Sequence, residues 1–383
     1  MLKNHSHLKT LLTIFFKAWT FGFISKSKFQ LLNILRQSIY PLYIIHGGSC
    51  VLWHLFVQIH DYTDILDVGF NLTDLIGLYQ ALMIYLGIVI YNKQRILEVF
   101  EFYEDLLEDE DVIMVKLRKR HFGRSIRIAY ICAKYFLMAT LAAFFLVVGY
   151  VLMKSDFRTI MFFDTPGISR SSIWFYPVNL MHQFFLFFTS FELIIISDVV
   201  IMITIVYCQA ELSAIAELIS LLNRRGNLSG TKPGMLVRKI SEVHLNIWMQ
   251  TKKITAAFYH IYFHKLMSIM LCMCTMFLIC HSPDPDISVG LLGALVMILQ
   301  ALVLCYFGQL LADCSKKILD AIYMTMWYEM TVRDQKDLLM LMMRFRRPIK
   351  VEAFGFGDIS IYTFVQICKA AVSYAAIIYT VLK

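Results

Sequence analysis

Two charged side chains lie inside long apolar segments of this chain, where an ionised group is costly unless it is paired. Lys134 lies in the segment 126–153, and Asp198 lies in the segment that begins near 184. If these segments cross a bilayer in opposite directions, the helical rise places both charges about 12 Å from its inner surface. The sequence therefore predicts an intramembrane ion pair between Lys134 and Asp198. Two roles stay open for it: fixing helix packing only, or taking part in gating.

Other residue types that could carry chemistry do not form a motif. His260 and His264 share a helical face at a spacing that can bind zinc, but no HExxH motif or third ligand accompanies them. Cys272 and Cys274 point about 200° apart on a helix. We find no catalytic triad, phosphate-binding loop or pair of carboxylates with a nucleophile nearby. The sequence predicts no metal site, no cofactor and no enzymatic activity.

The last apolar segment carries a polar stripe. Lys369, Ser373, Ile377 and Val381 recur every four residues, and Thr380 borders them. Hydroxyls that alternate with an aliphatic side chain fit a pore with a hydrophobic gate. The alternative is a packing face, on which Ala370, Ala371 and Ala375 allow another helix to approach closely.

Lys369 restricts the pore interpretation. Four copies would place four positive charges around one axis, which repels cations, whereas one copy beside neutral partners is tolerable. If this helix lines a cation pore, we therefore expect the chain to work with a different, channel-forming partner.

The composition places these residues in a membrane protein. Hydrophobic residues make up 58% of the 383, and the mean hydropathy is +0.63. About seven segments are long enough to span a bilayer, and lipid requires them to be helices. The first residues, MLKNHSHLK, do not resemble a cleavable signal peptide. The net charge of +8 gathers on alternate loops, so it indicates orientation and not nucleic-acid binding.

Lys and Arg concentrate in the N-terminal segment and in the loops after the second, fourth and sixth spans, which predicts a cytosolic N-terminus and an extracellular C-terminus. The sequence predicts an all-α protein with a cytosolic amphipathic segment (1–36) and spans 1–4 with an outward-facing ligand pocket (37–222). Spans 5–6 with cytosolic anchor helices (235–350) and a terminal pore helix (355–383) follow. A G-protein-coupled receptor has the opposite orientation.

The order and spacing of several stretches resemble those of the insect odorant receptors, which are seven-span ligand-gated channels with this inverted topology. These stretches are WFYPVNL, YCQAELSAIAELI, RKISEVHLNIW, CYFGQLLADCSKKILDAIYMTMWY and DISIYTFVQICKAAVSY. The resemblance implies a tetramer around a central pore lined by the last span, with Ile377 at the gate. It also implies a cytosolic helical bundle as the main subunit contact.

The resemblance further implies a ligand pocket among the outer halves of spans 2, 3, 4 and 6. Depth and side-chain type there select Tyr79, Met83, Phe144, Phe145, Val148, Phe188, Glu192 and Ile298. Glu192 can instead face a wet cavity.

The resemblance also indicates which subunit this is. The link NRRGNLSGTKPG is short where the odorant co-receptor carries a long insertion, so the chain resembles a ligand-tuning subunit. The implied partners are co-receptor subunits in a heterotetramer, a small volatile odorant and membrane lipid, in the plasma membrane of olfactory sensory neurons. A homomeric gustatory-type channel is the alternative, although Ser373-Tyr374 followed by Thr380-Val381 departs from the gustatory pattern.

Overall fold

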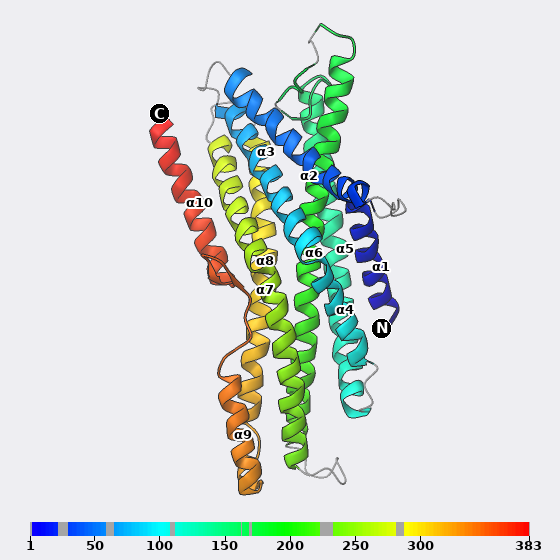
Figure 1. Cartoon of the computed structure of the whole chain (residues 1–383). Coiled ribbons are helices and arrows are strands. Elements are labelled where there is room, and N and C mark those ends of the chain that lie inside the picture. The colour runs from blue at the N-terminus through cyan, green and yellow to red at the C-terminus, as the bar shows by residue number, and fades with distance from the viewer. Residues whose placement is uncertain are drawn as a thin grey trace.

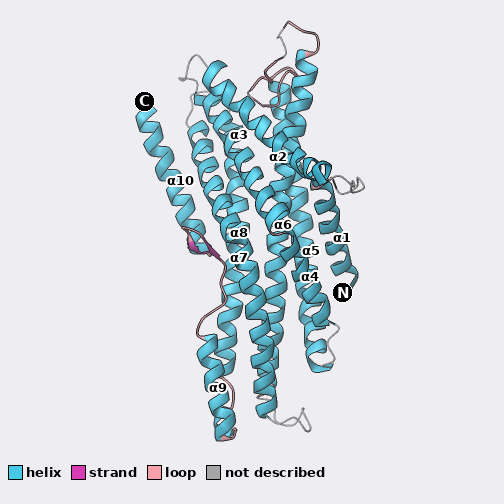
Figure 2. Ribbon diagram, in the orientation of Figure 1, coloured by secondary structure: helices cyan, strands magenta, loops and turns pink. Residues whose placement is uncertain are grey.

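The structure is a computed structural model, and it describes residues 2–21, 30–58, 65–107, 112–161, 163–167, 171–222, 233–280 and 287–382. Within these ranges the chain is a bundle of long helices (Figure 1), and its strands form one short hairpin (Figure 2). The elements are α1 (Leu2–Trp19), α2 (Gln30–Trp53), η1 (His54–Gln58), α3 (Ile65–Ile84), η2 (Tyr85–Tyr91), α4 (Lys93–Leu107), α5 (Val112–Lys154), α6 (Phe175–Leu221), α7 (Pro233–Cys280), α8 (Ile287–Tyr323), η3 (Trp327–Glu329), α9 (Val332–Phe345), β1 (Glu352–Ala353), β2 (Gly357–Asp358) and α10 (Ile361–Leu382).

Six stretches of the described chain are long and apolar enough to cross a membrane. They are Asp67–Tyr91, Ile113–Met153, Phe175–Leu221, Gly234–Cys280, Gly290–Tyr323 and Ile361–Thr380. The sequence predicted seven, and the remaining one, near 38–58, corresponds to α2 and η1. The middle of α2 reads HGGS, which lowers the hydropathy of this helix.

The helix α6 forms the centre of the bundle, and α10 lies at its edge. In the apolar stretch of 18 residues that makes α6 a candidate span, 83% is buried inside the chain. The corresponding share in α10 is 22%. The helix α6 packs against α5, α7 and α8, while the main contacts of α10 are with α7 and α8 (Figure 1). A largely uncovered apolar helix at the edge of a bundle must face lipid or another subunit.

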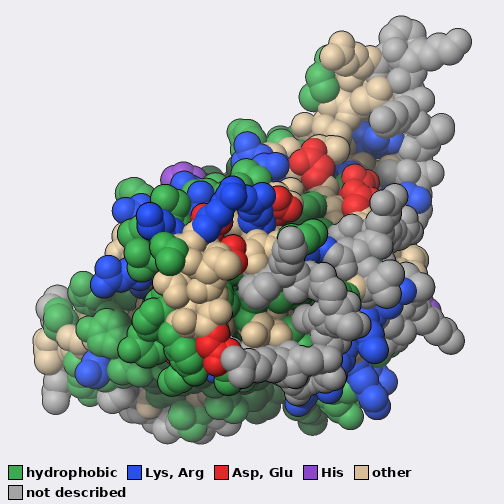
Figure 3. Space-filling view, turned by 90° about the horizontal axis from the view of Figure 1, so that it is seen from below, with side chains coloured by type: hydrophobic (Ala, Val, Ile, Leu, Met, Phe, Trp, Pro, Cys, Tyr) green, Lys and Arg blue, Asp and Glu red, His purple; other side chains and the backbone are tan. Residues whose placement is uncertain are grey.

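Three helices continue well beyond bilayer length toward the end of the molecule that carries α9. The helices α6, α7 and α8 contain 47, 48 and 37 residues, and a span needs about 20. The helix α9 packs on α7 and α8 there through Leu338, Leu341 and Phe345. Lys and Arg side chains are spread over this end when it is seen from below (Figure 3).

Two polar contacts hold the peripheral helices at this end. Arg118 of α5 and Glu211 of α6 form a buried ion pair at 2.9 Å. In α1, the imidazole of His5 lies 3.0 Å from the Glu104 carboxylate of α4, and Lys9 also bonds this carboxylate. Burial acts to raise the pKa of Glu104, but the hydrogen bonds from Lys9 and His5 outweigh it and lower that pKa. The cytosolic location of the segment 1–36, which contains α1, stays a prediction.

The connection into α10 passes very close to α8, at Gly308. A Cβ at this position would lie 2.5 Å from the backbone oxygen of Ile359, which precedes α10 by two residues. We therefore expect Gly308→Ala to destabilise the protein by about 1–3 kcal/mol, because backbone cannot yield as a side chain does. The measurement is the thermal unfolding midpoint of the purified protein.

Gly149 provides the matched control for this change. It also lies inside a helix, and a Cβ there would meet nothing within 4 Å. Gly149→Ala should be neutral or slightly stabilising, because alanine is the better helix former. Equal midpoints for the two variants would refute the close approach at Gly308.

Candidate functional site

A buried ion pair joins three helices in the centre of the bundle. The Lys265 Nζ of α7 lies 2.7 Å from Asp198 Oδ1 of α6, and the two side chains are 0% and 1% exposed. Gln300 of α8 donates to Asp198 Oδ2 at 2.8 Å. Lys265 also donates to Ser197 Oγ and to the Ile194 carbonyl. Both charges are therefore paired and hydrogen-bonded, as burial requires.

The predicted pair of Asp198 with Lys134 is wrong. Lys134 is exposed on the surface of α5, while Asp198 faces α7 and α8. The prediction matched the depths of two residues, but depth does not fix the direction in which a helix presents its side chain. Lys265 could have been found in the sequence, since it is the one Lys or Arg between residues 254 and 315.

Part of the predicted ligand pocket forms a cluster of aromatic rings between α5 and α6. Phe144 is buried at its centre, with its ring centroid 5.4 Å from that of Phe145 and 5.7 Å from that of Phe188. Phe187 and Phe191 lie closer, at 5.0 Å each, and were missed. Phe191 follows Phe187 by four residues and Phe188 by three, and residues at these spacings are neighbours on a helix surface. Val148 is buried one turn from Phe144, whereas Phe145 is 57% exposed.

The other predicted pocket residues lie on different helices. The Tyr79 hydroxyl of α3 lies 2.7 Å from His264 Nδ1 of α7, so these side chains are hydrogen-bonded to each other. Met83 of α3, Glu192 of α6 and Ile298 of α8 are half-buried. The structure thus brings Phe144, Phe145 and Phe188 together and places Tyr79 in an α3–α7 contact. The role of all eight residues in ligand binding stays a prediction.

The stripe on α10 that the sequence singled out is exposed. The opposite side packs on α7 and α8 through Ile367, Ala371 and Ala375, and the Cys274 thiol of α7 donates to the Ala371 carbonyl at 3.3 Å. The exposed stripe comprises Lys369, Ser373, Ile377 and Thr380. The side chain of Val381 lies outside the described residues. Small residues therefore supply the packing face, and the hydroxyls and Ile377 face outward from the chain.

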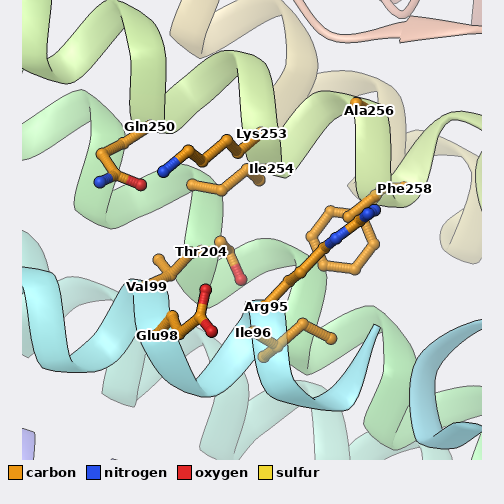
Figure 4. A pocket seen from close by; sticks show the side chains of 11 residues that line it. Arg95, Ile96, Glu98, Val99, Thr204, Gln250, Lys253, Ile254, Ala256 and Phe258 are labelled. Atoms are coloured by element: carbon orange, nitrogen blue, oxygen red, sulfur yellow. The ribbon is translucent and has the colours of Figure 1, made fainter. Parts of the chain in front are cut away.

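Near Tyr91, where the apolar stretch Asp67–Tyr91 ends, a cavity of about 360 Å³ opens between α4, α6 and α7 (Figure 4). Its polar lining consists of Arg95, Glu98, Thr204, Gln250 and Lys253. None of the eight predicted pocket residues lines it. Among the described residues, no group of three His, Cys, Asp or Glu side chains is arranged to hold a metal ion.

Comparison with solved structures gives the fold. The structure of olfactory receptor OR5 from Machilis hrabei in complex with eugenol matches with a TM-score of 0.79. The alignment covers 99% of this chain and 100% of that one at 10% sequence identity. The structure of the same receptor described without eugenol matches with a TM-score of 0.75 at 13% identity. Identities this low show a shared fold only.

Sequence comparison finds short segments of two curated proteins of Drosophila melanogaster. Odorant receptor 85f is 30% identical over 80 residues, which cover 21% of this chain and 20% of that protein. Odorant receptor 49a is 37% identical over 65 residues, which cover 17% of this chain and 16% of that protein. The matched segments therefore span a fifth or less of these relatives.

The family model covers far more of the chain. The model described as 7tm Odorant receptor matches residues 72–372, which include α6, α7, α8, the whole of α9 and the start of the exposed stripe on α10. That range contains the aromatic cluster and the buried ion pair as well. This chain is thus a multi-pass membrane protein that belongs to the seven-transmembrane odorant receptor family.

Proposed function

We propose that this chain is the ligand-tuning subunit of an odorant-gated, non-selective cation channel, assembled as a heterotetramer with odorant co-receptor subunits. Its family is one of ligand-gated receptors and not of enzymes. The observation that carries the proposal is α10, which packs by Ala371 and Ala375 and leaves Ser373 and Ile377 outward. Four such helices around an axis would enclose a pore with hydroxyls and an aliphatic ring.

The orientation that we propose has the N-terminus in the cytosol and the C-terminus outside the cell. The end of α6, the start of α7 and α9 lie at one end of the bundle, and the C-terminus lies at the other (Figure 1). The first end carries most of the Lys and Arg of the loops, which favours the cytosolic side. Olfactory sensory neurons are the corresponding cells, with the channel in their plasma membrane.

The ligand that we propose is a small, mostly apolar volatile. The related OR5 structure is a complex with eugenol. In this chain, Phe144, Phe145 and Phe188 offer aromatic surface between α5 and α6, and burial of apolar area supplies about 25 cal/mol per Å². Glu192 and Tyr79 are the polar groups that would orient a ligand. Met83, Val148 and Ile298 complete the proposed lining.

Gating follows from differential affinity. A ligand opens the channel only to the extent that it binds the open state more tightly than the closed state. Ligand binding among the outer halves of the spans would shift their packing, and α10 would follow through its contacts with α7 and α8. Movement of α10 away from the axis widens the constriction at Ile377.

Whole-cell currents test this proposal. Cells that express this chain with an odorant co-receptor should respond to members of a panel of small volatiles, rapidly and without G-protein activity. Cells that express this chain alone should give no current, because four copies of Lys369 oppose cation flow. Currents from the chain alone would identify a homomeric channel instead. A response abolished by G-protein blockade would indicate a G-protein-coupled receptor.

A further inference from the structure

Two cationic side chains reach into the cavity between α4, α6 and α7 from different helices. Arg95 extends from α4 and Lys253 from α7, and Glu98 of α4 also lines the cavity (Figure 4). The Arg95 guanidinium also donates to Asn92 Oδ1 at 3.3 Å. All three charged side chains are exposed, so each is accessible to a ligand from solution or from the membrane surface. The ligand pocket proposed above uses none of these groups.

Hydrogen bonds fix the depth of this cavity. Asn92 follows Tyr91, the last residue of an apolar span, and its side-chain amide donates to the Ala257 carbonyl of α7 at 3.1 Å. The same amide donates to the Gly87 carbonyl at 2.8 Å. Lys253 lies one turn below Ala257, or about 6 Å at the helical rise, and Arg95 lies about one turn below Tyr91. The cavity is therefore at the boundary where the apolar spans end.

The walls of the cavity suit an amphipathic molecule. Ile96, Val99, Ile254 and Phe258 are buried side chains that give it an apolar side. Gln250 adds an amide, and the Thr204 hydroxyl donates to the Val200 carbonyl at 2.5 Å, so its oxygen can still accept a hydrogen bond. A volume of about 360 Å³ falls within the range of small-molecule sites, about 300–1,000 Å³.

The charges select among the molecules found at that boundary. Arg95 and Lys253 complement two anionic groups, and an Arg guanidinium binds phosphate oxygens in a bidentate manner. Glu98 complements one cationic group and disfavours a headgroup that carries negative charge alone. Two anions and one cation are the charges of a phosphoserine headgroup, which consists of a phosphodiester, a carboxylate and an ammonium.

We propose that this cavity binds the headgroup of phosphatidylserine in the cytosolic leaflet. Arg95 and Lys253 hold the phosphodiester and the carboxylate, Glu98 holds the ammonium, and the apolar side receives the glycerol and the first acyl carbons. Anionic lipids, phosphatidylserine among them, give the cytosolic leaflet its negative surface potential. The cytosolic assignment rests on the orientation given under the proposed function.

Titration of lipid into the full-length chain tests this proposal. The chain is held in nanodiscs of phosphatidylcholine, and a fluorescent phosphatidylserine is added while its binding is followed by anisotropy. Nanodiscs carry the same lipid in both leaflets, so the result depends neither on orientation nor on odorant gating. Failure here leaves the channel proposal intact, and failure of the current recordings leaves this one intact.

Single substitutions should separate the roles of the three charges. Lys253→Gln and Arg95→Gln should each weaken phosphatidylserine binding about fivefold, since one cation near an anionic lipid surface contributes on that order. The matched control is Lys252→Gln, because Lys252 is the adjacent lysine but lies over the Trp248 ring and lines a different cavity. Lys252→Gln should leave the affinity within twofold of the wild type. Glu98→Gln should remove the preference for phosphatidylserine over phosphatidylglycerol, which has no ammonium.

Three results would overturn the proposal. Equal losses of phosphatidylserine affinity for Lys252→Gln and Lys253→Gln would mean that the lipid is attracted only by the overall surface charge. A wild-type preference for a phosphoinositide or for phosphatidylethanolamine would mean that the three charges do not match phosphoserine. Displacement of the lipid by soluble glycerophosphoserine at an equal concentration would assign the cavity to a free organic phosphate, because a lipid site gains affinity from the acyl chains.

Discussion

Replacing Lys265 with methionine should destabilise the protein by about 3–5 kcal/mol, the cost of leaving one partner of a buried ion pair uncompensated. Asp198 would keep the hydrogen bond from Gln300 but lose its cation, in a site where it is 1% exposed. Thermal unfolding of the detergent-solubilised protein, followed by fluorescence-detected gel filtration, measures the loss. Surface expression should fall with it, because a loss of this size is comparable to the whole stability of many domains.

The double variant Lys265→Met with Asp198→Asn should recover most of this loss, because neither remaining side chain is charged. In a double-mutant cycle with the two single variants, the coupling free energy between the two sites should exceed about 1 kcal/mol. If the two sites were independent, the losses of stability in the single variants would add up in the double variant. Lys134→Met is the matched control, since Lys134 is an exposed lysine in a span. If Lys134→Met destabilised the protein as much as Lys265→Met, the partner of Asp198 would be Lys134, as the sequence predicted.

Replacing Ile377 with alanine should produce current in the absence of odorant. The change removes three carbons from the proposed constriction, which at about 0.8 kcal/mol for each carbon weakens dewetting by about 2 kcal/mol per subunit. That energy corresponds to roughly a thirtyfold rise in the ratio of open to closed channels. Whole-cell recording of cells that express the variant with a co-receptor measures the basal current before any odorant is applied.

Ile378→Ala is the matched control for the gate. Ile377 and Ile378 are adjacent, both are exposed, at 54% and 40%, and the substitution is identical. The side chains point about 100° apart on the helix, so only Ile377 shares the stripe with Ser373. A silent Ile377 variant, or equal leak from both, would place the gate elsewhere on α10.

Local patterns in the sequence were enough to predict the helices and, for some helices, which residues share a face. Apolar length alone defines a span, because lipid forces each segment to satisfy its own backbone. The period of the helix likewise places Ser373 and Ile377 on one stripe of α10, and Ala371 and Ala375 on another. The helix α9 is amphipathic as well, and its buried side chains are Leu338, Leu341 and Phe345. Each of these conclusions needs only neighbours a few residues apart.

Contacts between distant helices required the tertiary structure. Asp198 meets Lys265 and Gln300, which follow it by 67 and 102 residues, and their meeting depends on how α6, α7 and α8 are rotated and shifted against one another. Depth along a span can be counted in the sequence, but rotation about the helix axis is set by the packing of the whole interface. The cavity between Arg95 and Lys253 arises for the same reason, from the side-by-side packing of α4 and α7. The sequence by itself therefore determined which residues the membrane must accommodate, and only the packed bundle decided which of them lie together.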